Sequence, residues 1–136
     1  MDSILRLLSV AAGIPIFGNA VMFIVDPETA ARQLGMPLLE GIGRSTQIGD
    51  FGSFFLCSSI AAFYGAWNRS PVMLYVAALL IGGAAVCRMI ASALHDAPFA
   101  TTFIVVELVL ATIWVVSARY FHQHHGKLME NVHSGK

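Results

Sequence analysis

Charged residues are scarce in this chain. Only 12% of its 136 residues are Asp, Glu, Lys or Arg, and the acids and bases cancel to a formal net charge of zero at pH 7. The eight Lys and Arg residues are scattered, so the sequence lacks the basic patch that nucleic-acid binding requires. We therefore expect no nucleic-acid partner.

Cysteines and catalytic motifs are also sparse. The two cysteines, Cys57 and Cys87, lie within apolar segments, where a thiol usually serves as a small packing residue. Neither has metal-ligand spacing around it, and we expect no disulfide. The sequence contains no nucleophile with an ordered base, no Gly-rich phosphate loop and no haem-attachment sequence. The cofactor stays unknown, and whether the protein is an enzyme stays open.

Apolar residues are what the chain has in excess. Hydrophobic residues make up 57% of it and the mean hydropathy is +0.72, which is more than a water-soluble domain tolerates. Four apolar segments, each long enough to cross a hydrocarbon core of about 30 Å, are separated by short polar turns. They cover about residues 4–25, 41–67, 72–94 and 99–120. Because short loops make neighbouring helices antiparallel, the sequence predicts an all-α integral membrane protein, an antiparallel four-helix bundle in a lipid bilayer.

A short surface helix is predicted between the first two spans. Asp26 is placed to cap it, Pro27 occupies its first position and Gly35 ends it, so the helix covers about residues 28–34. The transmembrane domain then comprises residues 1–120, and residues 121–136 form a polar, His-containing tail.

The first span has an alternative interpretation. Arg6, the apolar run after it and Gly18-Asn19-Ala20 are typical of a signal peptide with a cleavage site. The apolar run continues to Val25, however, which favours a retained spanning helix.

The distribution of Lys and Arg predicts the orientation. Four spans put both termini on one side of the membrane, and the other side has only Arg32 and Arg44, among four acids. The side with the termini carries more bases: Arg6, Arg69, Arg119, Lys127 and Lys136. The excess predicts cytoplasmic termini, because positively charged loops stay in the cytoplasm.

Small residues recur at every fourth position of the second span. The row consists of Gly41, Ser45, Gly49, Ser53, Cys57, Ala61 and Gly65. Lipid provides no hydrophobic drive between helices, so close backbone approach along such a row is how membrane helices pack. We favour contact within the bundle over the alternative, a surface for dimerisation or for a partner subunit.

One polar residue on each span lies at a similar depth. Asn19, Asp50, Arg88 and Glu107 are each six to eight residues, or roughly 9–12 Å, from the non-cytoplasmic surface. Such residues are costly in hydrocarbon and normally face the bundle interior, where they pair. The guanidinium group of Arg88 is therefore expected to engage Asp50 and Glu107 together, with Asn19 completing the hydrogen bonds.

Further polar residues extend this site toward the outer surface. Ser92 and His95 follow Arg88 along one face of the third span, Thr46 and Gln47 share a side with Asp50, and Arg44 is close enough to reach inward. Two interpretations stay open: an ion-pair network that fixes helix order, or a proton, quinone or ligand site.

Histidines cluster after the last span. His122, His124 and His125, with His133 further on, are weak candidates for binding Zn, Cu or Ni. No Cys or acidic residue completes a fixed site, so a solvated cytoplasmic tail without a metal is favoured.

Several motifs resemble a known group. The chain has Asp26-Pro27-Glu28-Thr29-Ala30-Ala31, Leu34-Gly35-Met36-Pro37, Arg44 with Gly49-Asp50, and Gly82-Gly83-Ala84-Ala85-Val86-Cys87-Arg88. Together with the four spans, over about residues 4–120, these look like the DoxX-like small four-helix membrane proteins, in particular an uncharacterised bacterial family of that kind. The resemblance implies a bacterial inner (plasma) membrane. It also implies, for some members, a subunit of a quinone-linked oxidoreductase, and it transfers no catalytic residue.

Three functions follow as hypotheses. The first is an accessory or structural subunit of a membrane complex, bound to another membrane protein or to copies of itself. The second is a quinone-linked oxidoreductase component that uses the buried polar site. The third is a small proton-coupled transporter, which is suggested by the two acids, Asp50 and Glu107, beside a single arginine.

Overall fold

All of the described secondary structure is helical. A computed structural model describes the backbone of residues 1–134 and the side chains of residues 1–123. The helices are α1 (Asp2–Val25), α2 (Pro27–Gln33), α3 (Gly41–Trp67), α4 (Pro71–His95) and α5 (Thr101–Ser134). The predicted all-α architecture, with a short helix between the first two spans, is confirmed.

Most helix bounds agree with the sequence, but α5 is longer than predicted. It continues to Ser134, past residue 120 where the sequence predicted the span to end. Lys127, Leu128, Met129 and Glu130 are strong helix formers, and a single glycine at position 126 costs only about 1 kcal/mol. A polar sequence alone therefore does not end this helix.

Four helices of the described chain are long and apolar enough to cross a membrane. They are α1, α3, α4 and the part of α5 from Thr101 to Gln123. Asp26 and Pro27 separate α1 from α2, which is too short to cross. The chain is therefore an integral membrane protein.

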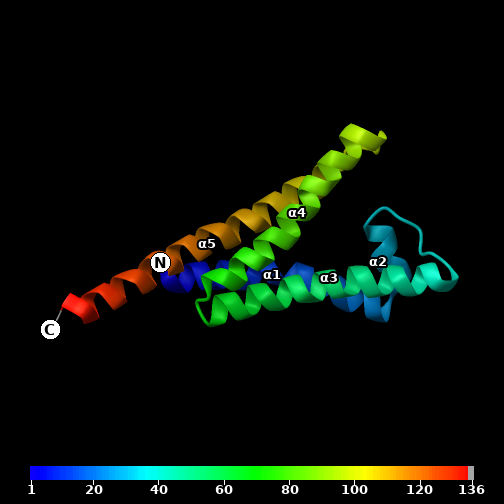
Figure 1. The fold of residues 1–136 in the computed structure, drawn as a ribbon. Helices are drawn as coiled ribbons and strands as arrows, with labels where there is room; N and C mark the ends of the chain where they lie inside the picture. Colours follow the sequence, from blue (N-terminus) through cyan, green and yellow to red (C-terminus); the bar gives the residue numbers. More distant parts are fainter. Residues whose placement is uncertain (135–136) are drawn as a thin grey trace.

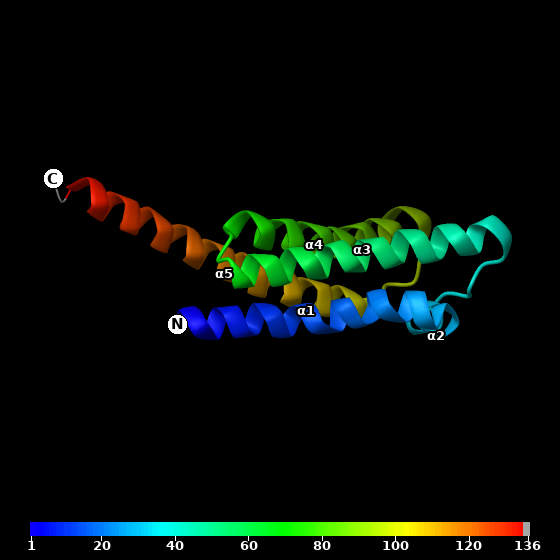
Figure 2. The same ribbon diagram turned by 90° about the horizontal axis from the view of Figure 1, so that it is seen from below.

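The four long helices form an antiparallel bundle with one closed end and one open end. The beginning of α1 and the last turns of α5 lie at the end that holds the turn between α3 and α4, which we call the closed end (Figures 1 and 2). Helix α2 and the loop between α4 and α5 lie at the other, open end. Around the bundle, α1 packs against α3 and α5, and α4 packs against the same two helices. In Figure 1, α4 and α5 diverge from α1 and α3 toward the open end.

Small residues bring α3 and α4 together at the closed end. A Cβ atom at Gly65 would lie 2.8 Å from Cγ of Leu74 and 2.9 Å from its backbone nitrogen. Ala62 of α3 and Ala77 of α4, each three residues from Gly65 or Leu74, are fully buried. By contrast, α4 has no buried residue after Ala85. The two helices are thus in close contact over only half of their length.

Buried polar groups join α1 to α5. The Ser9 hydroxyl donates to Oγ of Ser117 over 2.9 Å, and the indole Nε1 of Trp114 donates to the Ser9 carbonyl oxygen over 3.1 Å. All three residues are fully buried. In a membrane such bonds hold helices together and satisfy groups that lipid cannot.

Side-chain hydrogen bonds fix the segment around α2. Asp26 accepts from the Thr29 amide over 3.1 Å, and hydrogen bonds from the side chain and backbone of Thr29 lower the pKa of this carboxyl. Beyond α2, the Gln47 amide donates to the Pro37 carbonyl and accepts from the Leu39 amide. The loop before α3 is thereby held against the first turns of that helix.

The close contact at Gly65 predicts that two glycine-to-alanine substitutions differ in their effect on stability. Gly65→Ala should lower the free energy of unfolding by about 1–3 kcal/mol, because the new methyl group meets backbone as well as the Leu74 side chain. Gly18→Ala is the control, since a Cβ atom there meets nothing within 4 Å. Denaturant titration of the detergent-solubilised protein measures both. Equal stability of the two variants would contradict the close approach.

Candidate functional site

A cavity opens between α3, α4 and α5 toward the open end of the bundle. Its volume is about 320 Å³. The lining residues come from three helices: Asp50, Phe51, Phe54 and Phe55 of α3, Ala84 and Arg88 of α4, and Glu107 of α5. Three of the four polar residues predicted to meet thus line one cavity.

An ion pair joins α4 to α5 at this cavity. Nε of Arg88 donates to Oε1 of Glu107 over 3.1 Å, and the two side chains are 29% and 14% exposed. The guanidinium carbon of Arg88 also lies 4.9 Å from the centre of the Phe103 ring, within range of a cation–π contact. Both partners of Arg88 lie on α5, so the arginine joins the two helices of the α4–α5 hairpin.

The second carboxylate oxygen of Glu107 is left without a partner. Oε2 is buried and accepts no hydrogen bond from any side chain or backbone group that the structure describes. A buried acceptor that is left unsatisfied costs about 1–3 kcal/mol, and more when it is charged. This oxygen could accept from a donor that enters the cavity.

Asp50 lies across the cavity from this pair and is exposed. Among the described residues its carboxylate forms no ion pair and no hydrogen bond. The prediction that Arg88 engages both Asp50 and Glu107 is therefore wrong for Asp50. The physical reason is the divergence of α4 from α3, which leaves the cavity between the two side chains.

The other predicted site residues lie outside the cavity. Asn19 is half-buried on α1, which packs on the opposite side of the ring of helices from α4. Arg44 donates to the Leu39 carbonyl over 3.1 Å and lines an outer hollow with Glu28 and Arg32 instead of reaching inward. Ser92 and His95 follow Arg88 on α4 but do not line the cavity. Periodicity placed them on one face, yet α4 has diverged from α3 at their level (Figure 1).

A second hollow leads from the outer loop to the cavity. Its volume is about 390 Å³, and it shares Asp50 and Phe51 with the cavity. Thr46 and Gln47 also line it, so the prediction that these two residues share a side with Asp50 is confirmed. A small molecule or a side chain could therefore approach Asp50 from the α2–α3 loop.

The aromatic wall of the cavity was missed by sequence reasoning. Phe51 stacks on Phe23 of α1 with ring centres 5.5 Å apart, and Phe54 packs edge-on against Phe55 at 5.3 Å. Phe54 follows Asp50 by four residues and therefore shares its helix face, whereas Phe51 and Phe55 lie on neighbouring faces. The spacing of Asp50 and Phe54 was the available signal, but only polar residues were predicted to form the site.

The row of small residues on α3 is only partly in helix contact. Ala61 and Gly65 are buried, whereas Gly41, Ser45, Gly49, Ser53 and Cys57 are exposed. A Cβ atom at Gly49 would meet nothing within 4 Å. The predicted contact within the bundle is therefore wrong for the five outer members. They face away because α4 approaches α3 only at the closed end.

No metal site is present in the part of the chain whose side chains the structure describes. Within residues 1–123, no group of three or more His, Cys, Asp or Glu side chains could hold a metal ion. His122 is exposed, and Cys57 and Cys87 are both free and exposed. The side chains of His124, His125 and His133 lie outside the described residues.

Comparison with protein-family models, curated proteins and solved structures gives no match for this chain. What the site can do must follow from its own residues. Arg88 has N–H groups beyond the one bonded to Glu107, two carboxylates offer acceptors, and the phenylalanines supply an apolar wall. Such a mixture is typical of sites for ligands with a polar head and an apolar body.

The ion pair predicts strong coupling between its two members. Arg88→Leu should lower the free energy of unfolding by about 3 kcal/mol, because it leaves Glu107 buried and unpaired. The double variant Arg88→Leu, Glu107→Leu should recover most of that loss. A double-mutant cycle on unfolding in detergent measures the coupling. If the losses of stability in the two single variants simply added in the double variant, the ion pair would not stabilise the α4–α5 hairpin.

Proposed function

We propose that the chain is an accessory or structural subunit of a membrane complex, and that a helix of its partner covers the outer half of α3. The observation that carries this proposal is Asp50. It lies within a membrane span, it is exposed, and it has no partner among the described side chains. An ionisable group in that position costs several kcal/mol in lipid unless another group meets it.

The surroundings of Asp50 suit a helix partner. Ser45, Gly49, Ser53 and Cys57 are small and exposed along the same helix. Small residues let a second backbone approach closely, and polar groups then form bonds across the interface. The expected partner helix carries small residues and, at the level of Asp50, a donor such as a hydroxyl, an amide or a cation.

A different protein fits this surface better than a second copy of the chain. Two copies related by a two-fold axis would place the same surface on both sides of the contact. Asp50 would then approach Asp50, and two carboxylates at close range disfavour each other's charge. A partner with its own donor avoids this cost.

The orientation and location are part of the proposal. The closed end, which carries Arg6, Arg69 and Arg119, would face the cytoplasm, as the excess of Lys and Arg supports. The resemblance to the DoxX-like proteins supports a bacterial inner membrane.

Substitution at Gly49 tests the accessory function directly. Gly49→Leu should abolish association with the partner while the chain still inserts and folds, because a side chain there has open space within the chain itself. Gly18→Leu is the matched control, since it adds the same bulk at an equally open site on α1. Native mass spectrometry of complexes extracted in mild detergent measures association. A wild-type chain that is extracted alone, or equal association of both variants, would refute the proposal.

A quinone-linked oxidoreductase component is the second candidate, favoured by the cavity itself. The phenylalanines offer faces for a planar ring, and the N–H groups of Arg88 could donate to a ring oxygen. The proton-coupled transporter stays a prediction, because no described contact links Asp50 to Glu107.

The quinone hypothesis predicts a difference between two arginines. Arg88→Gln should weaken binding of a short-chain quinone about tenfold or more, since a charge-assisted hydrogen bond is lost. Arg44→Gln, outside the cavity, should leave the affinity unchanged. Calorimetric titration of the purified protein measures both, with helix content as the check on folding. Equal affinity in the two variants would remove this candidate.

A further inference from the structure

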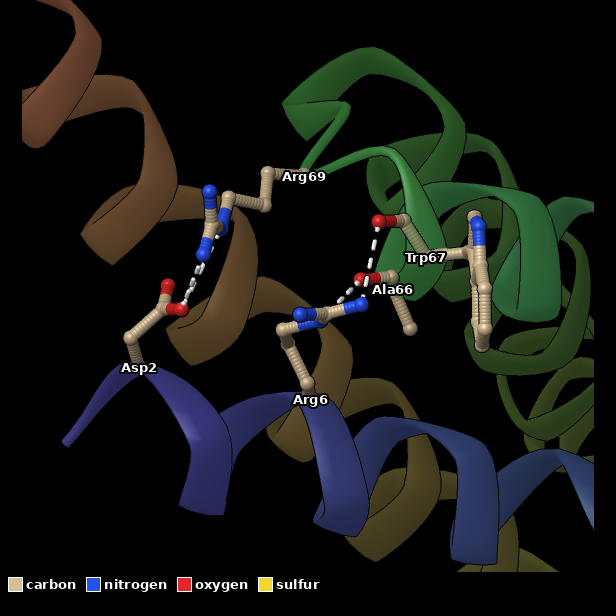
Figure 3. Close-up of polar contacts among 5 residues, drawn as sticks. All are labelled: Asp2, Arg6, Ala66, Trp67 and Arg69. Atoms are coloured by element: carbon tan, nitrogen blue, oxygen red, sulfur yellow. Dashed lines mark hydrogen bonds and ion pairs between the residues drawn. The ribbon is translucent and has the colours of Figure 1, made fainter.

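The closed end holds a second polar cluster, which the proposed function does not use. Arg6 of α1 reaches the last turn of α3, where Nε donates to the Ala66 carbonyl over 3.1 Å and Nη2 to the Trp67 carbonyl over 3.3 Å (Figure 3). The two preceding carbonyls, of Tyr64 and Gly65, accept from backbone amides beyond the helix. All four carbonyls that a helix end leaves open are thus satisfied, two of them by Arg6.

Arg69 and Asp2 form a separate pair beside this cluster. Nε and Nη2 of Arg69 lie 3.1 and 2.7 Å from Oδ2 of Asp2, as Figure 3 shows. Arg69 has a left-handed backbone, with φ of 52°, which is costly for a residue with a Cβ atom. The ion pair helps to hold the turn in that conformation, and it neutralises both charges.

Arg6 therefore keeps an uncompensated positive charge. Its two partners are neutral carbonyls, and it forms no ion pair with any described carboxylate. Its side chain is held between α1 and α3, and its guanidinium carbon lies 5.7 Å from the centre of the Trp67 ring. A half-buried cation without a counterion favours the approach of an anion.

An apolar groove runs from this charge along α1 and α3. A hollow of about 240 Å³ at Arg6 is lined by Ser3, Arg6, Leu7, Val10, Ala66 and Trp67. A larger one of about 470 Å³ continues from it, because both are lined by Val10 and Trp67. Its other lining residues are Ile60, Phe63, Tyr64 and Asn68. The groove thus has a charged head and an apolar body.

We infer that this groove binds an anionic phospholipid, with the phosphate beside Arg6 and an acyl chain along Val10, Ile60 and Phe63. Arg6 is in the second turn of α1 and Trp67 is the last residue of α3, so both lie at the end of their spans. Trp67 and Tyr64 are exposed, as aromatic residues of the membrane–water interface are. The phosphate would therefore sit at the depth of the lipid headgroups.

The lining of the groove selects among phosphate-containing molecules. No carboxylate lines either hollow, so the ammonium group of a zwitterionic headgroup would find no partner there. The stretch from Trp67 back to Ile60 is about 10 Å long, which a free phosphate ion would leave empty but an acyl chain would fill. An anionic lipid meets both the charge and the apolar surface.

Tryptophan fluorescence can test the inference, because Trp67 lines the groove whereas Trp114 is fully buried. The full chain would be placed in nanodiscs with phosphatidylglycerol or phosphatidylcholine whose acyl chains are brominated, since bromine quenches a nearby indole. We expect the wild type to prefer phosphatidylglycerol about fivefold, the effect of one arginine near an anionic headgroup. Arg6→Gln should lose that preference. Arg119→Gln, which removes an exposed arginine of α5 near the same end, should keep it.

A second variant separates lipid binding from damage to the end of α3. Val10→Phe keeps Arg6 and both of its carbonyl bonds but fills the groove, so quenching should fall for both brominated lipids. Excess inorganic phosphate, compared with chloride at equal ionic strength, should not relieve the quenching. Equal quenching by the two lipids in the wild type, equal effects of the two arginine variants, unchanged quenching in Val10→Phe, or relief by phosphate would each overturn the inference.

Discussion

The close approach of α3 and α4 at one end only is the constraint from which the rest of the structure follows. At Gly65 there is no room for a side chain, because atoms of Leu74 lie only 2.8–3.0 Å from the position that a Cβ atom would take. Beyond Ala85 no residue of α4 is buried, and α4 and α5 lean away from α1 and α3 (Figure 1). In a membrane, where packing and not the exclusion of water holds helices together, a bundle packed over half its length leaves the other half available to a partner.

The same divergence decides how the polar groups are used. Arg88 and Glu107 belong to one hairpin and remain paired, whereas Asp50 belongs to the other and is left alone across the cavity. Arg6, at the closed end, spans the tight contact between α1 and α3 and satisfies two helix-end carbonyls, but its charge stays uncompensated. Asp50 and Arg6, two charges without an ion pair, thus lie in opposite halves of the bundle. Each motivates a different binding partner.

Local sequence signals predicted much of the fold, whereas features that depend on how the helices pack could not be predicted. Hydropathy, with the Asp26 cap and the prolines, located the spans closely, because these signals act within a few residues. The pairing of Arg88 with Glu107 was predicted because the two residues lie at a similar depth in their spans. The exposure of Gly49 could not be predicted in this way, since periodicity fixes which residues share a face but not which helix covers it. The role of Arg6 was missed because its partners are backbone carbonyls, which no sequence pattern records.

The central claim is that another protein covers the outer half of α3 in the membrane. Photo-crosslinking in intact membranes tests it most directly, with a photoreactive side chain placed at Ser53 on that surface and, for comparison, at Leu79, which is 75% exposed on α4. The account predicts a discrete protein adduct from position 53 and only lipid adducts from position 79. Lipid adducts alone from both positions would contradict it.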